Sequence, residues 1–238
     1  MKKLECISCD TCPAWSLTVF QVLNQEEGLL LTKNIQRFRY RKGDPLFQEG
    51  DTPRHLFCMG KGKAKVVQHS GGDREQILHM VKAGDLMGYR AILGNDTYSC
   101  SGEVTEDTDI CHIPRDIFEK LLERNPALGL KISRMLALEL REAELKITQM
   151  ALRPVKERVA GALLSLLHHY GFEDDQVTLN YHLKREELAN MTGTTRETAT
   201  RMLYVLQKNG WIQVAGKKIR LLNLTALKEW VDTPSGAI

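Results

Sequence analysis

The 238-residue sequence predicts an α+β protein in three successive parts: an N-terminal antiparallel β-barrel or jelly roll, a long helix, and a C-terminal winged helix-turn-helix. Short strand-like runs broken by Gly-containing turns recur at roughly ten-residue intervals between Phe38 and Pro114, which is typical of a small all-β unit. A helical period without Pro or Gly follows Gly129, and two short amphipathic segments then flank Gly193. The predicted boundaries are 1–17 for a cysteine-containing segment ahead of these parts, 18–125 for the β-rich part, 126–153 for the long helix and 154–238 for the winged helix-turn-helix.

The composition, 42% hydrophobic and 26% charged, is that of an ordinary globular protein. No apolar run approaches the ~18 residues of a membrane span, so no membrane partner is expected. The N-terminus has two lysines but lacks the apolar stretch of a secretion signal, which favours a cytoplasmic protein. Six cysteines in that compartment indicate ligands, sensors or buried thiols rather than disulfides.

Positive charge is concentrated near the C-terminus. Residues 153–238 hold 12 Lys+Arg and 9 Asp+Glu, whereas residues 1–152 hold 21 of each. The excess falls within 184–220, where contacts with DNA phosphates would need it, although a solvated face gives the same small excess.

Three cysteines, Cys6, Cys9 and Cys12, open the chain at two-residue spacing, like the first positions of a ferredoxin-type iron-sulfur run. The fourth ligand of such a cluster has to come from elsewhere in the chain. The cysteines available are Cys58, Cys100 and Cys111. Zinc binding and three unligated thiols remain alternatives. The strand-rich region contains no G-x-S-x-G, H-E-x-x-H or phosphate-binding Gly loop, so an enzyme is not expected.

The long helix is apolar on two sides. Near-heptad spacing predicts that one stripe faces a second copy of the chain, in a homodimer. This stripe consists of Ile132, Leu136, Ala143 and Met150. Met135, Leu138 and Leu145 are expected to cover the barrel instead, and a core helix of a single chain is the alternative. Arg153-Pro154 should end the helix.

The stretch 184–210 predicts a helix-turn-helix whose second helix enters the DNA major groove with its N-terminus first. Apolar side chains repeat along one face of that helix: Ala199, Met202, Leu203 and Leu206. The side chains expected to meet DNA are Thr195, Arg196, Glu197, Thr200 and Arg201. Arginine can bind guanine, glutamate cytosine, and threonine a thymine methyl or a phosphate. Alternatively, Thr194 and Glu197 form a capping box that serves only the helix start.

A two-stranded wing should follow, formed by 211–214 and 219–221. Its turn carries Lys217 and Lys218, which are placed to contact phosphates.

Three motifs resemble the Crp/Fnr superfamily of bacterial transcription regulators. They are Lys42-Gly43-Asp44-x-Leu46-Phe47-x-x-Gly50-Asp51, Gly84-Asp85-Leu86-Met87-Gly88, and Arg196-Glu197-Thr198-x-x-Arg201-x-Leu203. The resemblance runs from about Thr18 to Val231. It implies a cyclic-nucleotide-binding-like sensor barrel, a long dimerisation helix and a winged helix-turn-helix. It also implies double-stranded DNA with palindromic, TTGA-like half-sites and RNA polymerase as partners.

Two branches of this superfamily make different demands on the sensor domain. The cyclic AMP branch needs a glutamate at the position of Tyr89 in this chain. It also needs an Arg-Ser or Arg-Thr pair, and at that place this chain has Tyr98 followed by Ser99. Because tyrosine supplies no cation for the cyclic phosphate, cyclic AMP is not expected.

The oxygen-sensing branch holds a [4Fe-4S] cluster, and Cys111 lies in a pattern similar to that of its late cysteine. The resemblance therefore implies a cluster on Cys6, Cys9, Cys12 and Cys111 that makes DNA binding respond to oxygen, nitric oxide or redox state. Cys12 lies closer to Cys9 than the corresponding cysteines of that branch. Thiol oxidation, a haem-bound gas and a small molecule other than cyclic AMP are the alternative signals.

Overall fold

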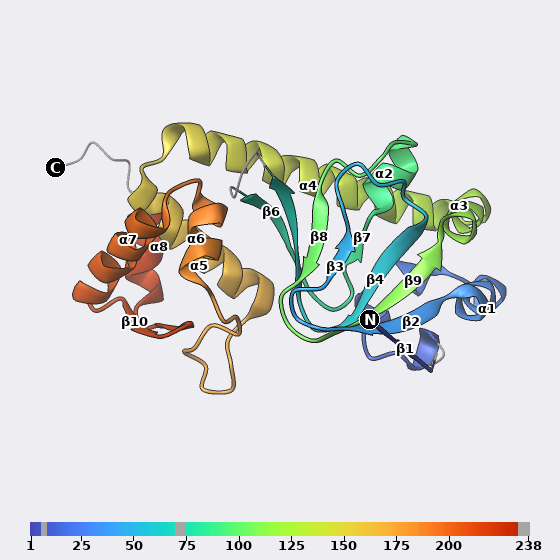
Figure 1. Cartoon of the computed structure of the whole chain (residues 1–238), viewed down its shortest axis with the longest axis horizontal. Helices are drawn as coiled ribbons and strands as arrows, with labels where there is room; N and C mark the ends of the chain where they lie inside the picture. Colours follow the sequence, from blue (N-terminus) through green and yellow to red (C-terminus); the bar gives the residue numbers. More distant parts are fainter. Residues whose placement is uncertain (6–8, 70–74, 233–238) are drawn as a thin grey trace. The chain divides into compact units, whose positions relative to one another are not determined.

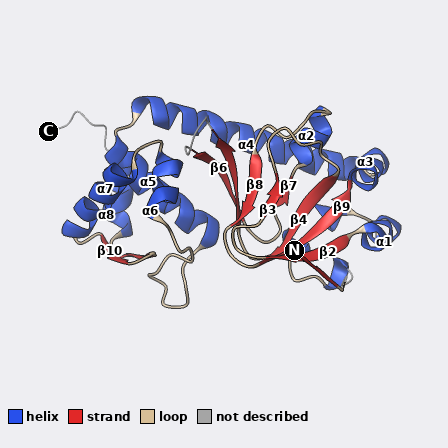
Figure 2. Ribbon diagram, viewed as in Figure 1, coloured by secondary structure: helices blue, strands red, loops and turns tan. Residues whose placement is uncertain are grey.

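The computed structural model describes residues 1–5, 9–69 and 75–232 of the chain. It divides into two compact units, one of Met1–Asp73 with Ile77–Glu139 and the other of Arg74–Gln76 with Leu140–Ile238. The first is rich in strands and the second mainly helical (Figure 2). The division falls inside helix α4 (Pro126–Leu152), so this helix contributes to both units.

Two open antiparallel sheets form the N-terminal unit (Figure 1). The five-stranded sheet contains, in order, β1 (Lys2–Leu4), β2 (Gln36–Tyr40), β9 (Thr108–Pro114), β4 (His55–Lys61) and β7 (Leu86–Met87). The four-stranded sheet contains β3 (Pro45–Phe47), β8 (Ser101–Val104), β5 (Ala64–His69) and β6 (Glu75–Val81). The predicted jelly roll is confirmed as a sandwich that does not close into a barrel.

Short helices precede, interrupt and follow the strands of the five-stranded sheet. They are η1 (Cys9–Thr11), η2 (Trp15–Leu17), η3 (Val19–Val22), α1 (Gln25–Asn34), α2 (Tyr89–Gly94) and α3 (Arg115–Arg124). α1 begins with a capping box, in which the Asn24 side chain accepts from the Glu27 N–H and the Glu27 carboxylate accepts from the Asn24 N–H. α1 and α3 lie side by side in Figure 1.

Alternating residues of β4 divide the core into two layers, because successive side chains of a strand point to opposite faces. Phe57 and Met59 pack between the two sheets, together with side chains of β3, β5, β8 and β9. Leu56 points the other way and packs with Phe118 of α3 and Leu128 of α4. The outer face of the five-stranded sheet is thus a second apolar layer, covered by helices.

The C-terminal unit has the predicted helix-turn-helix and wing. Its elements are α5 (Val155–Tyr170), α6 (Arg185–Thr192), α7 (Arg196–Lys208), β10 (Ile212–Ala215), β11 (Lys218–Leu221) and α8 (Leu224–Asp232). Pro154 stands between α4 and α5, as the sequence predicts. Leu163, Leu188 and Leu203 are fully or almost fully buried, where α5, α6 and α7 contact one another. No helix in the part of the chain that the structure describes is both long and apolar enough to cross a membrane.

Candidate functional site

The turn between α6 and α7 fixes how α7 is presented. Gly193 ends α6 with φ +59°, a left-handed conformation that glycine adopts without the strain of a Cβ atom. At the other end of α6, the Glu187 carboxylate accepts a 2.9 Å hydrogen bond from the Lys184 N–H. Residues next to α6 therefore cap both of its ends, and the capped helix supports α7.

Thr195 caps the start of α7, where its Oγ1 accepts a 3.2 Å hydrogen bond from the Thr198 N–H. The alternative capping box of Thr194 and Glu197 does not form, because the cap lies one residue further along the chain. Among the described residues the Glu197 carboxylate has neither a hydrogen bond nor an ion pair, and it is exposed. It is available to accept from a base edge.

The remaining side chains of α7 separate into two faces. Ala199, Leu203 and Leu206 are at most 2% exposed and anchor the helix. The opposite face exposes Arg196, Glu197, Thr200, Arg201 and Tyr204. The Arg201 guanidinium has no ion pair with any described residue, so both sides of its planar fork can reach a guanine edge. Tyr204 is 65% exposed, and its ring adds apolar surface to the same face.

The two lysines of the wing differ in their ion pairing. β10 and β11 pair antiparallel from Ile212 opposite Leu221 to Ala215 opposite Lys218. Lys218 Nζ lies 2.7 Å from Glu173 Oε2, so its charge is already partly neutralised. Lys217 is exposed and has no ion pair within the described chain. The Arg185 guanidinium donates to the Gly216 carbonyl at 3.1 Å and fixes the wing tip to the start of α6.

The long helix α4 presents apolar side chains in a different pattern from the predicted one. Ile132 is 3% exposed and packs within its own chain, which leaves little of it for a partner, while Leu136 packs against the same core. Leu138 and Leu145 are 61% and 51% exposed, so the prediction that they cover the barrel is wrong. Ala143 is exposed and Met150 half-buried. The predicted four-residue interface stays a prediction.

Four cysteines of the N-terminal unit line one cavity. Cys9, Cys12, Cys58 and Cys111 all line a space of about 180 Å³ whose other walls are largely apolar, formed by Trp15, Phe20, Leu31, Ile35 and Ile113 among others. Two predicted ligands from the N-terminus and one from β9 are thus brought together. Cys6 lies outside the described residues, and buried Cys100 belongs to the apolar layer between the sheets.

Local structure explains how Cys9 and Cys12 come to face one way. The Cys12 N–H donates to the Cys9 carbonyl at 3.1 Å, which closes a 3-10 turn. Side chains three residues apart are eclipsed in such a turn. The Cys9 N–H also lies 3.4 Å from Thr32 Oγ1 of α1, so the turn is held against the helix.

The electrostatic environment disfavours bare thiolates in the cavity. Burial raises the pKa of the Cys58 thiol well above its ordinary value, and the nearby thiols of Cys111, Cys12 and Cys9 raise it further. No Asp or Glu lines the cavity, whereas Arg37 and Lys61 do. Burial thus opposes a negative charge in the cavity, whereas Arg37 and Lys61 favour one.

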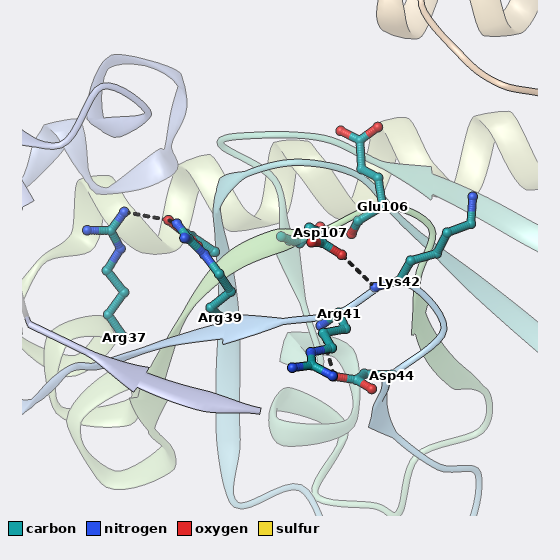
Figure 3. A network of polar contacts seen from close by, with 9 residues as sticks. Arg37, Arg39, Arg41, Lys42, Asp44, Glu106 and Asp107 are labelled. Atoms are coloured by element: carbon teal, nitrogen blue, oxygen red, sulfur yellow. Dashed lines mark hydrogen bonds and ion pairs between the residues drawn. The ribbon is translucent and has the colours of Figure 1, made fainter.

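Arg37 connects the cavity wall to a surface network of charges (Figure 3). It donates to Asp109 Oδ2 at 2.7 Å, and Arg39 binds the same carboxylate through two hydrogen bonds. The bond from Arg39 lowers the pKa of Asp109, and Arg37 acts in the same direction. Figure 3 also draws a separate contact nearby, in which Asp107 accepts from the Lys42 N–H. The ion pair with Asp109 holds Arg37 beside the cysteines.

The cysteine thiols do not already surround a single ion. Within the described ranges no three His, Cys, Asp or Glu side chains are close enough to hold one metal ion. A zinc ion binds all its thiolates at ~2.3 Å, whereas the cysteines of an iron-sulfur cluster bind different iron atoms and are spread more widely.

The two tyrosines at the cyclic-nucleotide positions are interior side chains. Tyr98 is 5% exposed, stacks on Phe47 with ring centres 4.3 Å apart, and donates from its hydroxyl to the His55 carbonyl at 3.2 Å. Burial raises its pKa to about 12, so it stays neutral. Tyr89 is 2% exposed, and burial likewise raises its pKa.

Comparison with known proteins agrees with this architecture. Residues 37–125 match the family described as the cyclic nucleotide-binding domain, and residues 157–230 match the Crp-like helix-turn-helix domain. The chain is 31% identical over 227 residues to the fumarate and nitrate reduction regulatory protein of Vibrio cholerae, covering 94% of this chain and 90% of that protein. The chain belongs to the Crp/Fnr family of transcription regulators. Members of this family are DNA-binding regulators and not enzymes.

Other Crp/Fnr relatives carry names from both branches. The cyclic AMP receptor protein of Thermus thermophilus is 29% identical over 211 residues, covering 89% of this chain and 95% of that protein. The solved structure of FixK2 from Bradyrhizobium japonicum has the same fold, with a TM-score of 0.76, 23% identity, and coverage of 84% of this chain and 98% of that one. Family membership therefore leaves the signal of this Crp/Fnr regulator to be inferred from its own residues.

Sequence reasoning missed two features of this Crp/Fnr chain. Cys58 was named only as an available cysteine, although strand alternation around it was a usable signal. The contact between Glu173 and Lys218 joins a loop to the wing across 45 residues, and no local pattern announces it.

Proposed function

We propose that this Crp/Fnr regulator binds palindromic DNA as a homodimer through α7, and that a [4Fe-4S] cluster in the cysteine cavity controls this binding. The observation that carries the proposal is the convergence of Cys9 and Cys12 with Cys111 on one cavity. The signal would be oxygen, nitric oxide or redox state. Cyclic AMP is not the proposed effector, because Tyr98 is a neutral interior residue at the position that needs a cation.

The donor set suits such a cluster. Cysteine thiolates are its usual ligands, and the cationic side chains of Arg37 and Lys61 line the same cavity without any carboxylate. When bound, the cluster supplies a group that reacts with oxygen or nitric oxide. Cys6 completes the ligand set predicted from the sequence, but it lies outside the described residues.

The ligand residues would couple that chemistry to the attachment of the N-terminal segment to the sheet. Cys9 and Cys12 belong to the N-terminal segment, whereas Cys111 belongs to β9. Ligation would hold the segment against the sheet, where Leu17 packs beside the turn at Gly84. Losing the ligands would leave the segment held by its apolar contacts, the pairing of β1 with β2 and the hydrogen bond from Cys9 to Thr32. We expect the tethered form to favour pairing of the two α4 helices.

Pairing would place two copies of α7 about 34 Å apart, the distance between successive major grooves on one face of DNA. The exposed Leu138, Leu140, Leu145 and Ile147 supply apolar surface for such pairing. Glu197 and Arg201 would then read the two half-sites.

Strictly anaerobic purification tests the proposal. We expect iron and acid-labile sulfide in the protein and specific binding to a duplex with two TTGA-like half-sites, both lost after exposure to air. A colourless protein without iron and sulfide would eliminate the cluster. Replacing Cys111 with serine should abolish the cluster, whereas replacing buried Cys100 with serine should not.

Direct thiol oxidation is the second candidate, because Cys58 and Cys111 face each other on neighbouring strands. It predicts that the metal-free protein changes its DNA affinity on mild oxidation and recovers it with a thiol reductant. Peptide mapping of the oxidised protein would identify the cysteines joined.

A further inference from the structure

Cys58 and Cys111 project from neighbouring strands into the same space. They are direct partners in the antiparallel register of β4 and β9, two inner strands of the five-stranded sheet. Such partners have their Cβ atoms about 4.5–5.5 Å apart on one face of a sheet. Phe57 and Met59 point between the sheets, so Cys58 points to the outer face with Leu56.

The N-terminal turn supplies two more thiols to that space. Cys9 and Cys12 line the same cavity as Cys58 and Cys111. The described part of the chain therefore places four cysteines around one cavity, which is the number of cysteine ligands that a [4Fe-4S] cluster takes.

A cysteine that only packs behaves as a small, buried apolar side chain, as Cys100 does between the two sheets. Cys58 is instead half-buried with three other thiols nearby, beside the cations Arg37 and Lys61. The four thiols are soft donors for a metal cluster, and the two cations can offset the negative charge of a cluster held by four thiolates.

We infer that Cys58 is the fourth protein ligand of the cluster, together with Cys9, Cys12 and Cys111, and that Cys6 is dispensable. This inference rests on the cluster proposed above and names its ligand set. Each cysteine would bind as a thiolate and release its proton to solvent, without any change in its own oxidation state.

The test uses the full chain, reconstituted anaerobically with ferrous iron and sulfide. Wild type is compared with Cys58→Ser, Cys6→Ser and, as a matched control outside the cavity, Cys100→Ser. We expect wild-type iron and sulfide contents for Cys6→Ser and Cys100→Ser, and loss of most of both for Cys58→Ser. The cluster-free Cys58→Ser protein should have the circular dichroism spectrum and thermal midpoint of the cluster-free wild type.

Alkylation of the wild-type protein gives a second readout that needs no substitution. With the cluster in place, iodoacetamide should modify Cys6 and leave Cys58 unmodified. After removal of iron with a chelator, Cys58 should become modifiable, and peptide mass spectrometry would locate each label. This readout decides the matter if Cys58→Ser fails to fold.

The possible outcomes separate this inference from the proposed function. A normal cluster in Cys58→Ser together with its loss in Cys6→Ser would overturn the role of Cys58 and leave the cluster proposal standing. Zinc without sulfide in the wild type, lost in Cys58→Ser, would refute the iron-sulfur cluster but retain Cys58 as a ligand. A wild type that binds neither iron nor zinc would overturn both.

Discussion

Replacing Arg201 with alanine should weaken binding to the palindromic site by about 1–3 kcal/mol, or roughly 5- to 150-fold in affinity, for each half-site contact. The magnitude follows from the geometry of α7. Arg201 is exposed and has no ion pair within the described chain, so the wild-type protein breaks no internal contact when it binds a guanine. The buried anchors Ala199 and Leu203 are untouched, so the free energy of unfolding should change by less than about 0.5 kcal/mol.

Fluorescence anisotropy with three duplexes measures this effect: the palindrome, the palindrome with its guanine replaced, and a random sequence. Arg201→Ala should bind the first two duplexes with similar affinity and the random duplex almost as wild type does. Lys217→Ala is the matched control, since it should weaken binding to all three alike and reduce the slope of log K against log salt by about 0.9 for each chain of the dimer. Equal losses for Arg201→Ala on the palindrome and the random duplex would refute base readout.

Three further substitutions test other contacts. Glu173→Gln removes the 2.7 Å ion pair that competes for Lys218, so DNA affinity at low salt should rise by about 0.2–1 kcal/mol in a titration. Gly84→Ala places a Cβ atom 2.4 Å from that of Leu17 at φ +93°, so the unfolding free energy measured in urea should fall by at least about 1–2 kcal/mol. Leu145→Asp adds a charge at a side chain that is 51% exposed, so sedimentation should show a weaker dimer while the fold of each chain persists.

Controls keep these results interpretable. Gly129→Ala on α4 has open space around its Cβ position and should leave stability unchanged or slightly raised. An effect of Glu173→Gln that is equal at high and low salt would contradict its electrostatic origin. A monomer–dimer equilibrium unchanged by Leu145→Asp would place the interface elsewhere.

Local patterns predicted the elements of the fold well. The Gly-containing turns and the alternating runs between them gave the two-sheet domain, and Gly193 with the apolar period after it gave α6 and α7. Each of these signals depends on backbone geometry within a few residues. The cap of α7 lies at Thr195, although Thr194 matches the capping pattern as well, because a one-residue choice depends on the turn before it.

Patterns that depend on distant parts of the chain were less predictable. The two faces of α4 were assigned by heptad spacing, which does not say what each face packs against, and Leu138 and Leu145 are exposed. Predicting the cavity would have required the pairing register of β4 and β9, which shifts between Met59 and Lys61. A slip of one residue would turn Cys58 to the other face of the sheet.

The hydrogen bond from Arg185 to the Gly216 carbonyl has a consequence for target choice. It holds the wing against α6, the helix that also supports α7. The wing and α7 of one chain therefore contact DNA at a fixed distance from each other. The number of base pairs inside each half-site is then set by a single chain and should not vary with the signal. Only the gap between half-sites, set by how two chains pair, is left for regulation to adjust.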